Sequence, residues 1–200
     1  MDKRFVGTEE LLVDSFRLAG RIHASGFEPT FIVGLWRGGT AVGIAVQEGL
    51  AYLGRATQHI SVRTSYAGRE SYDPSRRDPE RIQVHGTHFL LENLSAEDRL
   101  LVVDDVFSSG SSIDALVSRL RSRLKRNCPE EIRVAVPWFR PNDRSERRPD
   151  YFLHETSDWL VMPYELSGLA LDEIREHKPG VAAVLDRLAD FVASGEARRD

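Results

Sequence analysis

The chain of 200 residues has a single cysteine, Cys128, so it cannot form an internal disulfide. It also lacks a long hydrophobic run: the longest resemble residues 181–185, far short of the roughly 20 residues that cross a membrane. The residues that follow Met1 are polar and offer no apolar stretch of the length found in signal peptides. We therefore expect a cytoplasmic protein that has no membrane partner.

The sequence has no excess of positive charge, because 27 Lys and Arg residues face 31 Asp and Glu residues, a net charge of −4. Proteins that coat nucleic acids are usually basic overall, so a nucleic-acid partner is not expected. Residues 119–148 nevertheless carry a local charge of +6, and residues 150–200 a charge of −6. The basic stretch is interpreted either as a solvated helix face and loop or as a surface that faces an anionic ligand.

Hydrophobic residues make up 41% of the chain and charged residues 29%, which is typical of a globular domain. The hydrophobic periodicity predicts helices that alternate with short strands. Helices are predicted at 8–25, 40–53, 112–125 and from 179 onward, and strands at 30–36, 56–62, 87–91, 99–104, 131–137, 151–153 and 159–162. This alternation predicts an α/β fold with a mainly parallel sheet, in which ligands bind at the carboxyl ends of the strands.

Residues 63–86 are polar and show neither helical nor strand periodicity. Unstructured loops of this length are uncommon inside a compact domain and are often lids over active sites or disordered inserts. We favour the lid.

The segment from Leu100 to Ser112 carries the strongest chemical signal. An apolar strand ends in two adjacent carboxylates, Asp104 and Asp105, and a serine-rich turn around Gly110 then begins a helix. Backbone N–H groups at a helix N-terminus bind phosphate, and serine hydroxyls add hydrogen bonds. The carboxylates cannot bind the phosphate itself, so they indicate sugar hydroxyls, a divalent cation, or both.

The residues of this segment also allow other interpretations. A structural one is a serine-rich helix cap in which Ser111 and Asp114 form a capping box. The chain lacks the glycine-lysine phosphate loop of nucleoside triphosphatases and the Gly-x-Gly-x-x-Gly turn of dinucleotide-binding folds. The coincidence of strand, paired carboxylates, glycine and hydroxyls favours a phosphate site.

The same segment resembles the 5-phosphoribosyl-1-diphosphate (PRPP) motif of the type I phosphoribosyltransferases: an apolar strand, two acidic residues and a loop with Thr-Gly-x-Thr. Residues from about 30 to 165 resemble the purine branch of that family, whose members act on hypoxanthine, guanine or xanthine. The resemblance implies a single domain over residues 1–200. It further implies a flexible catalytic loop at 63–86, a base-binding hood region at 138–166 and a C-terminal helical segment at 168–196.

The resemblance also implies roles for individual residues. Asp104 and Asp105 would position the ribose hydroxyls or their Mg²⁺, and the turn that follows would hold the 5-phosphate. Arg37 and Gly38, in the Trp36–Gly39 match to the pyrophosphate loop, would bind the leaving group, and the peptide before the basic residue is often cis in this family. The residues implied to hold the phosphate are Ser108, Ser109, Gly110, Ser111 and Ser112.

The pair Ser65-Tyr66 matches the Ser-Tyr of the family's catalytic loop. Arg140 falls where a family lysine reads the exocyclic oxygen of the purine. Residues 158–165 resemble the hood, in which Trp159 would stack on the base and the backbone of Leu160 would bond its edge. Glu165 would help Asp105 to hold Mg²⁺.

Two positions depart from the family pattern. Ser108 stands where the purine enzymes usually have an aspartate that acts as a general acid and base near N7, and Arg140 replaces the lysine. A hydroxyl cannot take up a proton near neutral pH as a carboxylate can. The implied catalytic set is Arg37, Ser65, Tyr66, Asp104, Asp105 and Ser108.

The resemblance implies Mg²⁺-dependent transfer of the 5-phosphoribosyl group from PRPP to a purine base, which releases pyrophosphate and a nucleotide in purine salvage. It also implies a homodimer or homotetramer. One alternative is a regulatory protein that binds PRPP or a nucleotide with little turnover, which Ser108 favours. Another is phosphoribosyl transfer to an atypical base.

Overall fold

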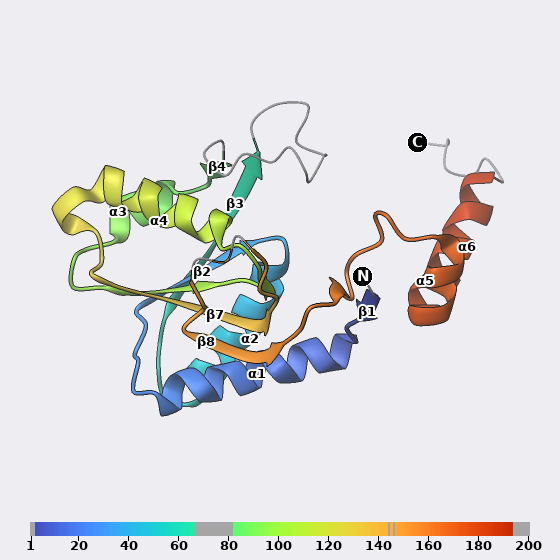
Figure 1. The fold of residues 1–200 in the computed structure, drawn as a ribbon, viewed down its shortest axis with the longest axis horizontal. Coiled ribbons are helices and arrows are strands. Elements are labelled where there is room, and N and C mark those ends of the chain that lie inside the picture. The colour runs from blue at the N-terminus through green and yellow to red at the C-terminus, as the bar shows by residue number, and fades with distance from the viewer. Residues whose placement is uncertain (1–2, 67–81, 144, 146, 194–200) are drawn as a thin grey trace. The chain divides into compact units, whose positions relative to one another are not determined.

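The computed structural model describes residues 3–66, 82–143, 145 and 147–193 (Figure 1). The described residues form two compact units. The first unit comprises residues 9–158, and the second comprises residues 3–8 together with residues 159–193.

The first unit is built on a seven-stranded sheet in the order β4-β3-β2-β5-β7-β6, with β8 also paired to β7. Every neighbouring pair is parallel except β3 and β4, so the predicted α/β fold with a mainly parallel sheet is confirmed. The strands are β2 (Phe31–Trp36), β3 (Gln58–Tyr66), β4 (Ile82–His85), β5 (Arg99–Val103), β6 (Val106–Phe107), β7 (Glu131–Phe139) and β8 (Tyr151–Glu155).

Helices cover both faces of this sheet. Figure 1 shows α3 and α4 on one face and α1 and α2 on the other. Hydrogen bonds tie one helix on each face to β3: Thr40 of α2 bonds Ser61, and Thr64 bonds Ser112 of α4. The helices are α1 (Thr8–Ala24), α2 (Gly38–Tyr52), α3 (His88–Asn93) and α4 (Ser111–Leu124), which a short 3₁₀ turn at Lys125–Asn127 extends.

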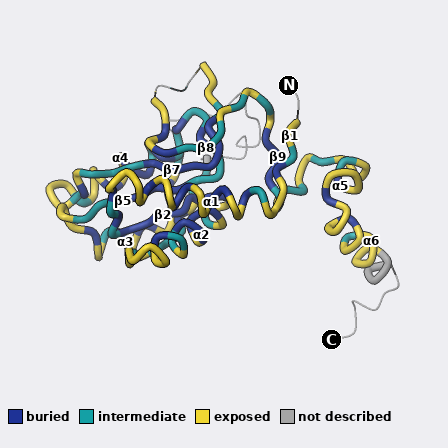
Figure 2. Tube along the Cα trace, turned by 90° about the horizontal axis from the view of Figure 1, so that it is seen from below, coloured by how far each residue is buried: buried dark blue, intermediate teal, exposed yellow. Residues whose placement is uncertain are grey.

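Strand β5 lies at the centre of the core. Its residues Leu100 to Val103 are completely buried, as expected for an apolar run with helices on both sides. Figure 2 shows buried residues along the neighbouring strands β2 and β7 as well. Because β5 is fully enclosed by packing, the position of the residues that follow it, Asp104 and Asp105, is set by the core.

The predicted strand at residues 87–91 is wrong. Thr87 is buried, and residues 88–93 form α3, in which Leu90 is fully buried while Phe89 is 38% exposed. The apolar run Phe89-Leu90-Leu91 is too short for periodicity to separate a strand from a helix. Arg119 of α4 donates a hydrogen bond to the Thr87 hydroxyl at 3.1 Å, a contact between distant residues that no local pattern shows.

The predicted loop at 63–86 also differs from the structure at both ends. Strand β3 continues through residues 63–66, and residues 82–85 form β4, which pairs with β3 in antiparallel register. Residues 63–66 are polar without alternation, and the alternation of β4 is only four residues long, so neither segment was predicted as a strand. The remainder of the predicted loop, residues 67–81, lies outside the described residues.

In the second unit, β1 (Lys3–Phe5) pairs in parallel with β9 (Trp159–Val161), and α5 (Leu171–His177) and α6 (Pro179–Ala193) follow. The Phe5 ring stacks on His177 with 3.8 Å between the ring centroids. Lys178 is buried and donates hydrogen bonds to the carbonyls of Met162 and Pro163 at 2.5 and 3.1 Å. Burial lowers the pKa of Lys178.

Across both units, no described helix has the length and hydrophobicity required to span a bilayer.

Replacing Gly34 in β2 with alanine should destabilise the protein. An added Cβ would lie 2.8 Å from the carbonyl oxygen of Gly39 and 3.1 Å from the Cα of Thr40, both backbone atoms of α2. Overpacking of this kind costs about 1–3 kcal/mol, so urea denaturation of Gly34→Ala should show that loss of unfolding free energy.

The matched control is Gly20→Ala in α1, where an added Cβ meets no atom within 4 Å. That substitution should stabilise the protein by about 0.4–1 kcal/mol, because alanine restricts the unfolded chain. Equal stability of the two variants would contradict the close approach of β2 and α2.

Candidate active site

The turn between β5 and α4 forms a small pocket of about 130 Å³ at the carboxyl end of the sheet. Asp104 and residues 106–113 line this pocket. Gly110 has a left-handed backbone with φ of +82°, and a Cβ there would lie 2.6 Å from the Phe107 ring. The Ser109 and Ser111 hydroxyls are 2.9 Å apart. Helix α4 begins at Ser111, so its first N–H groups and the serine hydroxyls face an anion-sized space.

The two carboxylates that precede this turn are held by backbone N–H groups. The Asp105 N–H donates to Asp104 Oδ1 at 3.0 Å, and the Val106 N–H donates to Asp105 Oδ1 at 2.8 Å. Burial raises the pKa of Asp104 well above its ordinary value, and the adjacent charge of Asp105 raises it further. The Gly39 N–H donates a hydrogen bond to the Asp104 carboxyl, and this bond lowers the pKa of Asp104. A costly buried carboxylate at a strand end is typical of a functional group.

The pyrophosphate-loop match lies directly beside these carboxylates. The Trp36–Arg37 peptide is cis, and α2 begins immediately after it at Gly38. A Cβ on Gly39 would lie 2.3 Å from the carbonyl oxygen of Val103 and 2.9 Å from the Cα of Asp104. Only a glycine allows this approach, which brings the N-terminus of α2 against the end of β5.

Ser65 and Tyr66 occupy the end of β3, and Ser65 is within hydrogen-bond distance of His85 in β4, with 2.9 Å between Oγ and Nε2. Its neighbour Thr64 donates to Ser112 at 3.3 Å, which connects β3 to the start of α4. The side chain of Tyr66 lies outside the described part of the chain. Ser65 is therefore connected to the phosphate turn through the adjacent residue.

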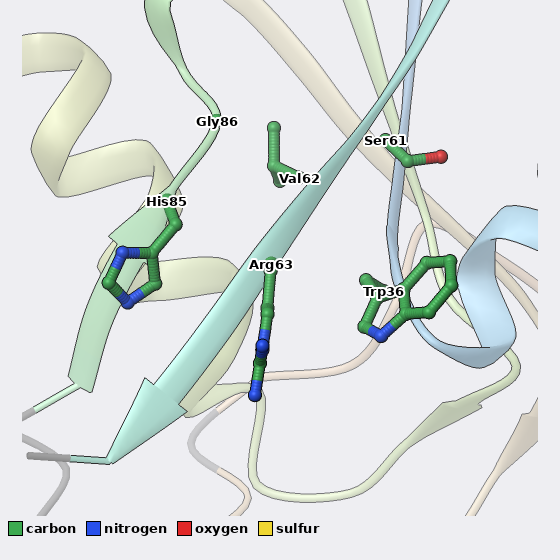
Figure 3. A pocket seen from close by; sticks show the side chains of 6 residues that line it. All are labelled: Trp36, Ser61, Val62, Arg63, His85 and Gly86. Carbon is green, nitrogen blue, oxygen red and sulfur yellow. The ribbon is translucent and has the colours of Figure 1, made fainter.

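A second pocket of about 410 Å³ opens beside the pyrophosphate loop (Figure 3). Trp36, Arg63 and His85 are register partners on three neighbouring strands, and Figure 3 shows the Arg63 side chain between the other two. Arg63 and His85 were not predicted as site residues. The position of Arg63, two residues before the Ser65-Tyr66 match, was an available signal, whereas His85 had none because β4 was not predicted.

Arg140 follows β7 and reaches the same edge of the sheet. Its N–H donates to the carbonyl of Phe107 at 2.8 Å, which places it across from Ser108. The structure thus brings together the predicted residues of the phosphate turn, the pyrophosphate loop, the end of β3 and the loop after β7.

Three predicted residues belong to the second unit. Trp159 and Leu160 are in β9, where Trp159 is 49% exposed and Leu160 is buried. Glu165 accepts a hydrogen bond from the Met162 N–H at 3.2 Å. Their roles in base binding and metal binding stay predictions.

The described residues contain no group of three or more His, Cys, Asp or Glu side chains arranged to hold a metal ion. Proteins usually bind Mg²⁺ through one or two carboxylates together with water and substrate oxygens. Asp104 and Asp105 supply two hard oxygen donors beside the phosphate turn, so the donor set fits a Mg²⁺ that also contacts the substrate.

A family model described as the phosphoribosyl transferase domain matches residues 7–167. The chain therefore belongs to the phosphoribosyl transferase domain family, and the predicted family is confirmed. No curated protein matches the sequence.

Solved structures with the same fold include a purine phosphoribosyltransferase of Pyrococcus horikoshii, with a TM-score of 0.63, 20% identity, and coverage of 85% of this chain and 98% of that one. The xanthine-guanine-hypoxanthine phosphoribosyltransferase of Helicobacter pylori has a TM-score of 0.61 at 18% identity, covering 88% and 99%. A hypothetical protein of Neisseria gonorrhoeae with bound ppGpp has a TM-score of 0.65 at 16% identity, covering 90% and 97%. These likenesses establish the shared fold.

Replacing Asp104 with asparagine should raise the thermal stability of the protein near neutral pH. Below its ordinary pKa of 3.8 the carboxyl is protonated in both the folded and the unfolded state. As the pH rises above that value, the unfolded state ionises first, so this group destabilises the fold increasingly until the raised folded pKa is reached.

Asparagine keeps an acceptor for the N–H groups of Gly39 and Asp105 but cannot ionise. Calorimetric melting of both proteins between acid and neutral pH should show the Asn variant more stable at neutral pH, with the difference vanishing in acid. A variant that is less stable at neutral pH would contradict the burial cost assigned to Asp104.

Proposed function

We propose that this protein transfers the 5-phosphoribosyl group of PRPP to a purine base in a Mg²⁺-dependent reaction that releases pyrophosphate, as an enzyme of purine salvage in the cytoplasm. The observation that carries this proposal is the contact of Gly39 with Val103 and Asp104. It brings two helix N-termini and two carboxylates to one point at the edge of the sheet, as a substrate with phosphates at both ends and a sugar between them requires.

Each part of the site has a role in this reaction. The N–H groups and hydroxyls of residues 109–112 hold the 5-phosphate, and Asp104 and Asp105 orient the ribose hydroxyls. Cleavage of the bond between C1 and pyrophosphate builds positive charge on the ribose and negative charge on the leaving group. Arg37 and the first N–H groups of α2 stabilise that negative charge.

Bound Mg²⁺ would supply Lewis-acid stabilisation of the pyrophosphate oxygens, and Asp105 would hold it. Ser65 and Tyr66, at the end of β3, would border the reacting groups and help to exclude water, which otherwise hydrolyses PRPP. Trp159 would stack on the base and Leu160 would bond its edge, while Arg140 would read an exocyclic oxygen. Stacking on an indole favours a flat heterocycle over an aliphatic amine.

A second candidate is a regulatory protein that binds PRPP or a nucleotide with little turnover. The observation that favours it is Ser108, which is hydrogen-bonded by Asn142 and offers no carboxylate to move a proton. The Neisseria protein of similar fold, solved with bound ppGpp, shows that such a fold can hold a highly phosphorylated nucleotide.

The test is to incubate the purified protein with PRPP, Mg²⁺ and separate purine bases, and to follow pyrophosphate and nucleotide by chromatography and mass spectrometry. Product from hypoxanthine, guanine or xanthine supports the enzyme. Tight PRPP binding with no product from any base supports the regulatory protein.

Asp105→Asn should lower PRPP-dependent turnover by at least about 10²-fold, because one of the two carboxylates that orient the ribose and its metal is lost. Its melting temperature should stay close to that of the unmodified protein, since Asn retains the acceptor for the Val106 N–H. Asp172→Asn, at a fully exposed position of α5, is the matched control and should leave turnover unchanged. Normal turnover in Asp105→Asn would contradict the proposed site.

A further inference from the structure

Arg63 lies on the face of the sheet that α2 covers. Along a strand, side chains alternate between the two faces of the sheet. In β3, the Thr64 hydroxyl donates to Ser112 of α4, so its neighbour Arg63 faces the opposite side. Figure 3 shows Arg63 and Val62 extending in opposite directions from this strand, and Val62 belongs to the hydrophobic core. Arg63 therefore shares a face with the residues of β3 that contact α2.

The contacts between β3 and α2 give the position of Arg63 along that face. His59 lies against the second turn of α2, where a Cβ on Gly43 would be 2.8 Å from the His59 Nε2. Two residues further along β3, Ser61 accepts a hydrogen bond from Thr40 in the first turn of α2 at 3.0 Å. Arg63 is the next side chain on this face, so it lies at the N-terminal end of α2.

The pocket that Arg63 lines is rich in hydrogen-bond donors. The guanidinium and the Trp36 indole carry N–H donors, and neither group can accept a hydrogen bond. Among the described residues, the Arg63 side chain takes part in no ion pair or hydrogen bond. None of the described residues that line the pocket carries a carboxylate. A cation without a counter-charge, set among other donors, indicates a ligand that is anionic and rich in acceptors.

The size and the position of this pocket indicate an anion longer than one phosphate. Its volume is about 410 Å³, compared with about 130 Å³ for the pocket at the phosphate turn. It adjoins the start of α2, whose first turn has no acidic side chain and whose N-cap residue Arg37 makes no capping bond. Uncapped N–H groups at a helix N-terminus bind anions. Trp36, the register partner of Arg63, directly precedes Arg37, so the guanidinium and these N–H groups border the same space.

We propose that Arg63 binds the outer phosphate of the pyrophosphate group, the one farther from C1, both in PRPP and in the released product. This inference rests on the proposed function. In the transfer, the bond between C1 and the pyrophosphate oxygen breaks and its electron pair stays on that oxygen. A bond forms between C1 and a nitrogen of the base, and a neutral base also releases one proton to water. Negative charge grows on the leaving group, and the fixed guanidinium stabilises it at the end remote from C1.

The experiment measures, by titration calorimetry in the presence of Mg²⁺, the Kd values of PRPP, pyrophosphate and ribose 1,5-bisphosphate. The last of these ligands has a single phosphate at C1 and therefore lacks the outer phosphate. Loss of a hydrogen bond between charged groups weakens binding by roughly 10- to 10²-fold. Arg63→Gln should raise the Kd of PRPP and of pyrophosphate by that factor and leave the Kd of ribose 1,5-bisphosphate unchanged.

Two further variants test the physical reason for this loss. Arg63→Lys keeps the charge but not the parallel N–H groups that hold a phosphate, so it should weaken PRPP binding less than Arg63→Gln does. The matched control is Arg123→Gln, which removes an exposed cation from α4 and should leave all three Kd values unchanged. In the transfer assay, Arg63→Gln should raise the KM for PRPP and leave the KM for the base unchanged.

Unchanged Kd values for PRPP and pyrophosphate in Arg63→Gln would overturn this inference and leave the proposed function intact. An equal loss for all three ligands would also overturn it, because the effect would then not depend on the outer phosphate. A protein that forms no nucleotide with any base, but loses pyrophosphate affinity in Arg63→Gln, would contradict the proposed function and support the role of Arg63. If Arg63→Gln does not fold, Arg63→Lys gives the same comparison among the three ligands.

Discussion

The organisation of the site depends on one backbone contact, the approach of Gly39 to Val103 and Asp104. Strands β2 and β5 are adjacent and parallel, with Gly34 opposite Val103. Because Gly34 and Gly39 both lack a Cβ, α2 can begin directly over the end of β5. Its first N–H groups then reach the Asp104 carboxyl, and α4 begins a few residues later along the same edge. Any side chain at Gly39 would separate the two anion-binding turns.

Part of this architecture could be predicted from local sequence, because local sequence determines it. The four apolar residues of β5, the paired carboxylates and the serine turn are contiguous, and both their fold and their chemistry follow from that order. The two turns could be assigned to one edge because the carboxyl ends of parallel strands lie together.

The remainder depends on contacts between distant residues. The hydrogen bond from Asn142 to Ser108 joins two irregular segments whose residues are 34 positions apart. The hydrophobic periodicity of the sequence cannot predict such a contact. Strand β1 has three residues and is defined only by its partner β9. The conformation of residues 87–91 also depends on a distant contact. Their side-chain composition predicted a strand, but the buried Thr87 bonds Arg119 of α4 and a helix follows it. Tertiary contacts decide the conformation of such short segments.

Part of the uneven charge of the chain has a structural explanation. Within the basic stretch, Arg133 pairs with Glu131, Arg147 with Asp114, and Arg148 with Glu155. Partly exposed pairs of this kind each contribute about 0–1 kcal/mol and neutralise one another. The proposed phosphate site of this acidic protein therefore relies on backbone N–H groups, serine hydroxyls and Arg37 at the edge of the sheet, and the net charge of the chain gives no indication of it.

The pairing of β1 with β9 has a consequence for how the chain acquires its structure on the ribosome. Residues 3–5 take their place in a sheet only after residues 159–161 have been synthesised, whereas the parallel sheet between them is encoded by the intervening segment. Domains generally form as units during synthesis, with N-terminal parts first. Strand β1 reverses that order: it is synthesised before the strands of the parallel sheet but can pair only after β9 has been made.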